Sequence, residues 1–275
     1  MEITGERVLT LEVLRIQGPG KLSGEISVHG AKNSTLPLLA ASLLCKSEAV
    51  LHNCPLLSDV DTAVRILRTL GCRVRREGHT LTIDSSTLSG DEIPENLMRE
   101  MRSSIVFLGA VVSRLGKARL SFPGGCELGP RPIDLHLAAL RKMGLHIRED
   151  HGCLECSVPG RLRGCPISLS FPSVGATENV MLAAVCAEGS TILSNAAREP
   201  EICDLADFLN ACGGRVSGAG ESEIVIQGVE SLGGCEHQVI PDRIVAATYL
   251  AAAAATGSEL ALRHVDCSHL QLVVP

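Results

Sequence analysis

Apolar residues along the chain alternate between a helical period and a strand period, and the two patterns recur in a fixed order. Three amphipathic segments each place glycine ten positions after aspartate, which predicts helices with an acidic start and a glycine stop. They are residues 61–71, 134–144 and 204–214. Two short strands with glycine in the turn follow each one, at 72–74 with 80–83, 145–147 with 154–158, and 215–217 with 223–226. These pairs predict three hairpins.

A second, more apolar and alanine-rich helix is predicted before each amphipathic one, at 34–44, 101–115 and 176–187. Short strands at 49–51, 118–122 and 191–193 link the two helices. The repeating unit is therefore helix, strand, helix, hairpin, with a further strand such as 24–28 leading in. It recurs about every 70 residues, which is the period of a repeat architecture.

One unit cannot bury its own sheet, so three units are expected to pack together with the apolar helices in the middle. This predicts an α/β fold in which residues 24–229 form one complete domain. Residues 230–275 begin a second domain, with a helix at 243–256 and a strand at 259–262, and residues 1–23 are expected to belong to that domain. The chain stops inside the fourth unit, which predicts a truncated form of a longer two-domain protein.

The composition argues against several classes of function. Of the 275 residues 45% are hydrophobic and only 2% aromatic, so platforms for stacking nucleic-acid bases are nearly absent. The formal net charge of −6 argues against a nucleic-acid or anionic-membrane surface. The longest apolar run, 244–255, is too short to span a bilayer, and residues 1–10 lack the pattern of a signal peptide. A cytoplasmic protein is expected.

Twelve cysteines raise the question of disulfides or metal. Most lie within apolar patterns, so reduced core thiols are predicted. Cys153 and Cys156 have the spacing of metal ligands, but a predicted strand points them to opposite faces, and no second pair follows at a suitable distance. No metal and no cofactor are expected.

The segment 121–136 differs from the scaffold. The connection from strand to aspartate is three residues longer in the middle unit than in the other two, and its glycines and prolines predict a loop that carries Cys126 and Arg131. Pro132 suits a first helical position and Asp134 a first turn, so backbone N–H groups and Arg131 predict an anion site beside a thiol. Cys126 could be a nucleophile or a proton donor, or a loop residue without a chemical role.

Two further basic residues stand at the starts of the apolar helices. Lys32 precedes the first and Arg102 begins the second, where the helix dipole favours anions. The third helix begins at a turn of small residues, Ser173–Thr177, which offers backbone N–H groups. Pseudo-symmetry is expected to bring these three starts to one end of the domain, next to the Cys126 loop.

Eight motifs resemble those of the UDP-N-acetylglucosamine 1-carboxyvinyltransferase family of enolpyruvyl transferases. They are Gly30–Asn33, Asp59–Asp61, Met101–Ser104, Pro123–Cys126, Arg131–His136, Ser173–Thr177, Asn195–Glu201 and Pro241–Ile244. The resemblance implies two domains, each an inside-out α/β barrel of three units, with the active site in the cleft between them. It also implies transfer of the enolpyruvyl group of phosphoenolpyruvate to the 3-hydroxyl of UDP-N-acetylglucosamine, the step that opens peptidoglycan synthesis.

The same resemblance implies a role for individual residues. Cys126 would be the proton donor, would carry a phosphoenolpyruvate adduct and would be alkylated by fosfomycin. Lys32, Asn33 and Arg131 would bind phosphoenolpyruvate. The expected contacts of the sugar nucleotide are Arg102, Arg131, Pro132, Ile133, Asp134, Leu135, Ser173, Val174 and Gly175.

Two departures from the family pattern matter. Phe171 and Pro172 stand where the family often has a basic residue near the diphosphate, and the match covers only about two-thirds of the family's length. Little or no turnover is therefore expected. The open end is expected to make the chain self-associate or become disordered after about Val239. The alternatives are a non-catalytic sugar-nucleotide-binding module, half of a two-chain assembly, and the related enolpyruvyl transferase of the shikimate pathway.

Overall fold

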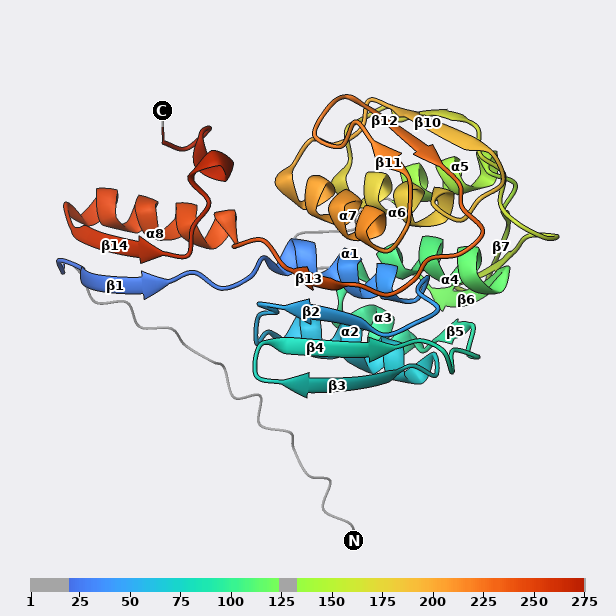
Figure 1. The fold of residues 1–275 in the computed structure, drawn as a ribbon, viewed down its shortest axis with the longest axis horizontal. Coiled ribbons are helices and arrows are strands. Elements are labelled where there is room, and N and C mark those ends of the chain that lie inside the picture. The colour runs from blue at the N-terminus through green and yellow to red at the C-terminus, as the bar shows by residue number, and fades with distance from the viewer. Residues whose placement is uncertain (1–19, 124–132, 275) are drawn as a thin grey trace, which may run out of the picture.

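The computed structural model describes residues 20–123 and 133–274 of the chain. Within these ranges the protein has two lobes (Figure 1). The large lobe contains three four-stranded sheets with helices between them, and the small lobe contains a two-stranded sheet and a helix. The α/β class and the repeated helix–strand–helix–hairpin unit are confirmed.

The strands follow the same order in all three sheets of the large lobe. A lead-in strand pairs in parallel with a central strand, and the nearer strand of a hairpin pairs antiparallel with that central strand. The first sheet contains β13 (Glu236–Gln238), β2 (Ala49–His52), β4 (Thr80–Asp84) and β3 (Arg73–Glu77). The second contains β5 (Glu92–Ile93), β6 (Lys117–Ser121), β8 (Cys153–Ser157) and β7 (His146–Asp150). The third contains β9 (Pro166–Ser168), β10 (Ser190–Ser194), β12 (Glu223–Gln227) and β11 (Val216–Ser217).

Two sets of helices cover the inner faces of these sheets. The inner set is α1 (Lys32–Ser42), α4 (Phe107–Leu115) with the preceding 3-10 helix η1 (Arg102–Val106), and α6 (Val174–Ala184). The outer set is α2 (Ser58–Thr69), α5 (Asp134–Lys142) and α7 (Pro200–Ala211). Nine of the 11 residues of α1 and nine of the 11 of α6 are buried. Burial of these apolar helices in the middle of the lobe is therefore confirmed (Figure 1).

One strand has a different partner from the one expected. Residues 24–28 were predicted to lead into the first unit, but β1 (Ser23–Ser27) pairs in parallel with β14 (Glu259–Arg263) in the small lobe. The first sheet takes its lead-in strand from β13, which follows the third unit. A short polar strand such as Glu236–Gln238 has no hydrophobic alternation, so its pairing is set by the closure of the three units.

The small lobe repeats the first half of a unit. Helix α8 (Arg243–Thr256) has the predicted bounds, and β14 and then the 3-10 helix η2 (Cys267–Leu270) follow it. Of the α8 residues only Ala246 is buried. None of the helices in the described ranges is long and apolar enough to cross a membrane.

Candidate functional site

Helix starts gather at one end of the large lobe. In each sheet the two parallel strands end on the same side, and α2, α5 and α7 begin after the central strands β2, β6 and β10. Helix α6 follows β9, and α1 begins beside the residues that follow β13. This end faces the small lobe (Figure 1). Free backbone N–H groups at helix starts make such an end favourable for anions.

The starts of α5 and α6 are in contact. A Cβ atom added to Gly175 would lie 3.1 Å from Cε1 of His136, so glycine lets the first turn of α6 approach α5. Nδ2 of Asn179 in α6 donates to Nδ1 of His136 at 2.9 Å, and the Ser173 side chain caps α6 by accepting from the N–H of Ala176. The predicted nucleotide contacts in residues 133–135 and 173–175 therefore lie together.

The buried histidine at this contact stays neutral. Burial lowers the pKa of His136 from 6.5 to about 4. Its Nδ1 atom therefore accepts the hydrogen bond from Asn179 at neutral pH. A neutral ring adds no charge to this end of the lobe, so we assign His136 a structural role there.

Arg102 begins η1 beside the same contact. Asn179 also donates to the carbonyl of Ile105 at 2.8 Å and accepts from the N–H of Gly109 at 2.6 Å, which fixes η1 and α4 against α6. The Nε atom of Arg102 is buried and has no hydrogen-bond partner among the described residues. A buried unpaired donor is costly, so an acceptor is expected at this position.

Lys32 and Asn33 form the first turn of α1. The Nζ atom of Lys32 lies 2.9 Å from Oδ2 of Asp59 in the first turn of α2, and their side chains are 41% and 30% exposed. An ion pair this exposed is worth at most about 1 kcal/mol, so an anionic ligand could compete with Asp59 for the ammonium group. Asn33 is exposed at the same end.

Sequence reasoning missed a set of buried acids in α6 and α7. Glu201 in α7 is 2% exposed and accepts from Arg243 of α8 at 3.0, 3.3 and 3.2 Å. Burial, with the negative charges of Glu201 and Glu199, raises the pKa of Glu178 well above 4.5. Glu201 and the half-buried Glu199 stand in the quoted motif 195–201, and an acid within the apolar segment 174–184 was the available signal for Glu178.

A third buried acid joins the start of α1 to α7. Asp204 is 3% exposed, accepts from the hydroxyl of Ser34 in α1, and lies with Oδ1 at 2.8 Å from Nε2 of His237 in β13. The acidic start predicted for this helix at Asp204 is wrong, since α7 begins at Pro200 and Asp204 lies inside it. The amphipathic pattern did not reveal that the chain upstream continues the helix.

Cys126, Arg131 and Pro132 lie outside the described residues. Ile133 is buried at the N-cap of α5, whose helical residues begin at Asp134 and Leu135. The Phe171 side chain, at the position of the expected basic residue, is 65% exposed. The predicted strand over Cys153 and Cys156 is confirmed as β8. Among residues 20–123 and 133–274 no group of three or more His, Cys, Asp or Glu side chains could hold a metal ion.

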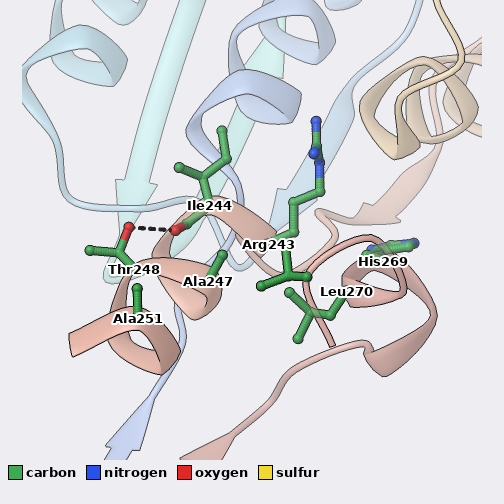
Figure 2. A pocket seen from close by; sticks show the side chains of 8 residues that line it. Arg243, Ile244, Ala247, Thr248, Ala251, His269 and Leu270 are labelled. Atoms are coloured by element: carbon green, nitrogen blue, oxygen red, sulfur yellow. Dashed lines mark hydrogen bonds between the residues drawn. The ribbon is translucent and has the colours of Figure 1, made fainter. Parts of the chain in front are cut away.

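A groove of about 320 Å³ lies elsewhere, in the small lobe (Figure 2). Ile244, Ala247 and Ala251 line it from α8, and His269 and Leu270 line it from η2. No residue of the predicted substrate site contributes to this groove. It reflects the exposed apolar face of α8.

Comparison with known proteins gives a consistent result. Residues 16–274 match the family model described as EPSP synthase (3-phosphoshikimate 1-carboxyvinyltransferase). The chain is 52% identical over 260 residues to UDP-N-acetylglucosamine 1-carboxyvinyltransferase 2 of Caldanaerobacter subterraneus subsp. tengcongensis, covering 94% of this chain and 62% of that protein. It is 53% identical over 263 residues to UDP-N-acetylglucosamine 1-carboxyvinyltransferase 1 of Symbiobacterium thermophilum, with coverage of 94% and 60%. The chain thus spans about three-fifths of the length of these curated relatives.

Solved structures share the fold. The enolpyruvyl transferase NikO from Streptomyces tendae superposes with a TM-score of 0.76 at 28% identity, covering 86% of this chain and 56% of that one. EPSP synthase from Acinetobacter baumannii superposes with a TM-score of 0.70 at 22% identity, covering 90% and 57%. The repeated unit inferred from the sequence is therefore that of the enolpyruvyl transferase fold.

Proposed function

Because the chain belongs to the EPSP synthase (3-phosphoshikimate 1-carboxyvinyltransferase) family, we propose that it carries substrate-binding residues of a UDP-N-acetylglucosamine 1-carboxyvinyltransferase. That enzyme transfers the enolpyruvyl group of phosphoenolpyruvate to the 3-hydroxyl of UDP-N-acetylglucosamine and releases phosphate, the first committed step of peptidoglycan synthesis. Two relatives that are 52% and 53% identical carry this name and support the proposal. A shikimate-pathway activity is less favoured, because the EPSP synthase structure is only 22% identical.

The observation that carries the proposal is the gathering of the starts of α1, α5 and α6 at the end that faces the small lobe. Both substrates are anions, and helix starts with nearby cations suit phosphate and carboxylate groups. We assign phosphoenolpyruvate to Lys32, Asn33 and Arg131. The sugar nucleotide is assigned to Arg102, to residues 131–135 and to residues 173–175. The buried Nε of Arg102, which has no hydrogen-bond partner in residues 20–123 and 133–274, supports its part in that assignment.

Cys126 supplies the chemistry in this proposal. It protonates the methylene carbon of phosphoenolpyruvate while the sugar hydroxyl attacks the adjacent carbon and loses its proton to a base. The tetrahedral intermediate then expels phosphate and loses a proton from the new methyl group, which restores the enol ether. Preorganised cations and backbone N–H groups stabilise the charge that develops in these steps.

The remaining assignments concern the whole protein. We place residues 24–229 in the first domain, and residues 1–23 and 230–275 in the second, with two exchanged strands: β1 (Ser23–Ser27) pairs with β14 in the small lobe, and β13 returns to the first sheet. The protein is placed in the cytoplasm. A second candidate, a non-catalytic sugar-nucleotide-binding half or one chain of a two-chain assembly, is supported by the exposed apolar face of α8, through which self-association is expected.

Alkylation by fosfomycin tests the site assignment in the chain itself. We expect Cys126 to be labelled first, faster with UDP-N-acetylglucosamine and more slowly with inorganic phosphate, as measured by peptide mapping after brief exposure. Burial raises the pKa of Cys54 and Cys72 to about 12, which keeps such thiols protonated and slow. The exposed Cys267 in η2 is the internal control. Equal labelling of Cys126 and Cys267, or labelling at Cys126 that neither ligand changes, would contradict the proposal.

A further inference from the structure

One carboxylate contacts the first turn of a helix in each lobe. Asp242 is the N-cap of α8, where its Oδ1 accepts from the N–H groups of Ile244 and Val245 at 2.9 and 3.0 Å. Its Oδ2 accepts from the N–H of Lys32 at 3.3 Å. Asp242 is 7% exposed, so both contacts are shielded from water.

Helix α1 needs this contact because it has no cap of its own. Its N-cap residue is Ala31, which has no side-chain acceptor for the free N–H groups of the first turn. Asp242, 210 residues away in sequence from Lys32, supplies that acceptor. The first turn of α1 therefore requires a hydrogen-bond acceptor from another segment of the chain.

Two connecting segments between the lobes hold Asp242 in place. Its own N–H donates to the carbonyl of His29 at 2.9 Å, and the N–H of Ala31 donates to the carbonyl of Ile240 at 2.7 Å. A Cβ atom on Gly30 would lie 1.8 Å from the carbonyl oxygen of Asn53, so only glycine lets this crossing pass so close to the large lobe. These backbone hydrogen bonds hold the main chain of Asp242 beside the residues that lead into α1.

The next residue adds a second tie across the lobes. Arg243, the first helical residue of α8, is bound through two of its nitrogens to both carboxylate oxygens of the buried Glu201 in α7. Paired planar groups of this kind define an orientation as well as a distance. Rotation of α8 about this tie would move Asp242 relative to Lys32.

We infer that Asp242 is a positioning residue that couples the orientation of the small lobe to the start of α1, where Lys32 stands. One carboxylate oxygen serves each helix, so a change in the orientation of α8 alters the acceptor available to the N–H of Lys32. In the proposed function Lys32 binds phosphoenolpyruvate, and for that part the inference rests on the proposed function. The coupling itself rests on the hydrogen bonds alone.

Two substitutions at one position separate the two contacts. Asp242→Asn keeps an oxygen that can cap α8 but replaces the second oxygen with an amide group, which cannot accept from Lys32. Asp242→Ala removes both acceptors. Asp266→Ala is the matched control, because Asp266 caps η2 by accepting from Ser268 at 2.9 Å within the small lobe.

Residue-resolved amide hydrogen exchange on the full chain measures the coupling. For Asp242→Asn we expect exchange at Lys32 to become about fivefold faster, the equivalent of about 1 kcal/mol for a lost cap, with Ile244 and Val245 unchanged. Asp242→Ala should accelerate exchange in both helices, and Asp266→Ala in neither. Unchanged exchange at Lys32 in Asp242→Asn, or equal acceleration throughout the large lobe, overturns the inference.

Binding of inorganic phosphate then tests the link to the site. Phosphate should slow reductive methylation of Lys32 in the wild-type chain, and Asp242→Asn should weaken that protection several-fold. Asp59→Asn, which frees the Lys32 ammonium group without touching its backbone, should strengthen it. If phosphate fails to protect wild-type Lys32, the proposed substrate site fails, while the exchange result still decides the coupling. If phosphate protects Lys32 in Asp242→Asn as well as it does in the wild-type chain, the coupling does not reach the ammonium group and the inference is wrong.

Discussion

Helices α6 and α8 have similar alanine-rich, apolar sequences and different surroundings. In α6 nine residues are buried between the sheets of the large lobe, whereas in α8 only Ala246 is buried. Both belong to the same repeating unit, and they differ in how many other units surround them. Burial of a repeat helix is therefore a property of the packed assembly, and a helix sequence taken alone does not decide it.

The largest expected effect comes from placing the same charge in each helix. Ala183 in α6 is fully buried and Ala251 in α8 is exposed. Ala183→Asp would bury an unpaired carboxylate and is expected to cost more than about 4 kcal/mol, enough to prevent folding. Ala251→Asp should change the free energy of unfolding by less than about 1 kcal/mol. Urea unfolding followed by circular dichroism gives both values.

The same pair of variants tests whether the α8 face is used. If the chain associates through that face, Ala251→Asp should lower the fraction of dimer or larger species in sedimentation velocity experiments. A cost for Ala251→Asp close to that for Ala183→Asp, at a protein concentration where the chain is monomeric, would break the contrast between the two helices.

The second prediction concerns His136, the buried polar side chain of α5 that contacts Asn179 of α6. In the folded chain burial lowers the pKa of His136 to about 4, against 6.5 unperturbed. Between these values the unfolded chain binds more protons, so stability is full above pH 6.5 and falls as the pH drops toward 4, by about 3 kcal/mol in all. The stability advantage of wild type over His136→Gln, measured by urea unfolding, should shrink over that window.

The exposed His264 in the small lobe gives the control for this experiment. His264→Gln should differ from wild type by a small amount that stays constant from pH 7 to pH 4.5. A constant difference for His136→Gln as well would mean that the ring is hydrated and that its contact with Asn179 opens.

Hydrophobic period and turn residues were sufficient to predict most of the fold. The bounds of α8 were predicted to the residue, and three hairpins followed from glycine between alternating strands. The lead-in strands were not predictable in this way, because β13 is short and polar and its partner lies far away in sequence. The short helix α3 (Glu95–Glu100) was missed for a similar reason, since six residues carry little periodicity.

The residues of the candidate site also fall into those that local sequence patterns reveal and those that only the packed fold reveals. Lys32, Arg102 and Ser173 were recognisable because charged or small residues precede apolar helices, and that local signal is readable in sequence. Asp204 and Asp242 act on helices 170 and 210 residues away in sequence, so only the packed fold reveals their partners. Buried acids with distant partners are therefore the part of this site that sequence patterns do not show.

The smallest expected effect belongs to Glu178, the acid inside α6. Burial, with Glu201 and Glu199 nearby, raises its pKa in the folded chain above the unperturbed 4.5. The protonated form is therefore favoured by folding, and this contribution is full below pH 4.5 and is lost as the pH rises through the folded pKa. Glu178→Gln imitates the protonated form, so it should stabilise the chain at pH 8 by about 1 kcal/mol, the usual size for a favourable single substitution.

The gain should nearly vanish near pH 4.5, where wild-type Glu178 also carries its proton, and thermal unfolding at the two pH values measures it. The exposed Glu259 in β14 offers the matched control: Glu259→Gln should change stability little, and equally at both pH values. A loss of stability in Glu178→Gln at pH 8 would show that α6 holds a charged carboxylate with partners of its own. Helix α6 would then differ from the exposed helix α8 in two ways: it is shielded from water, and it holds a buried charge that neighbouring groups compensate.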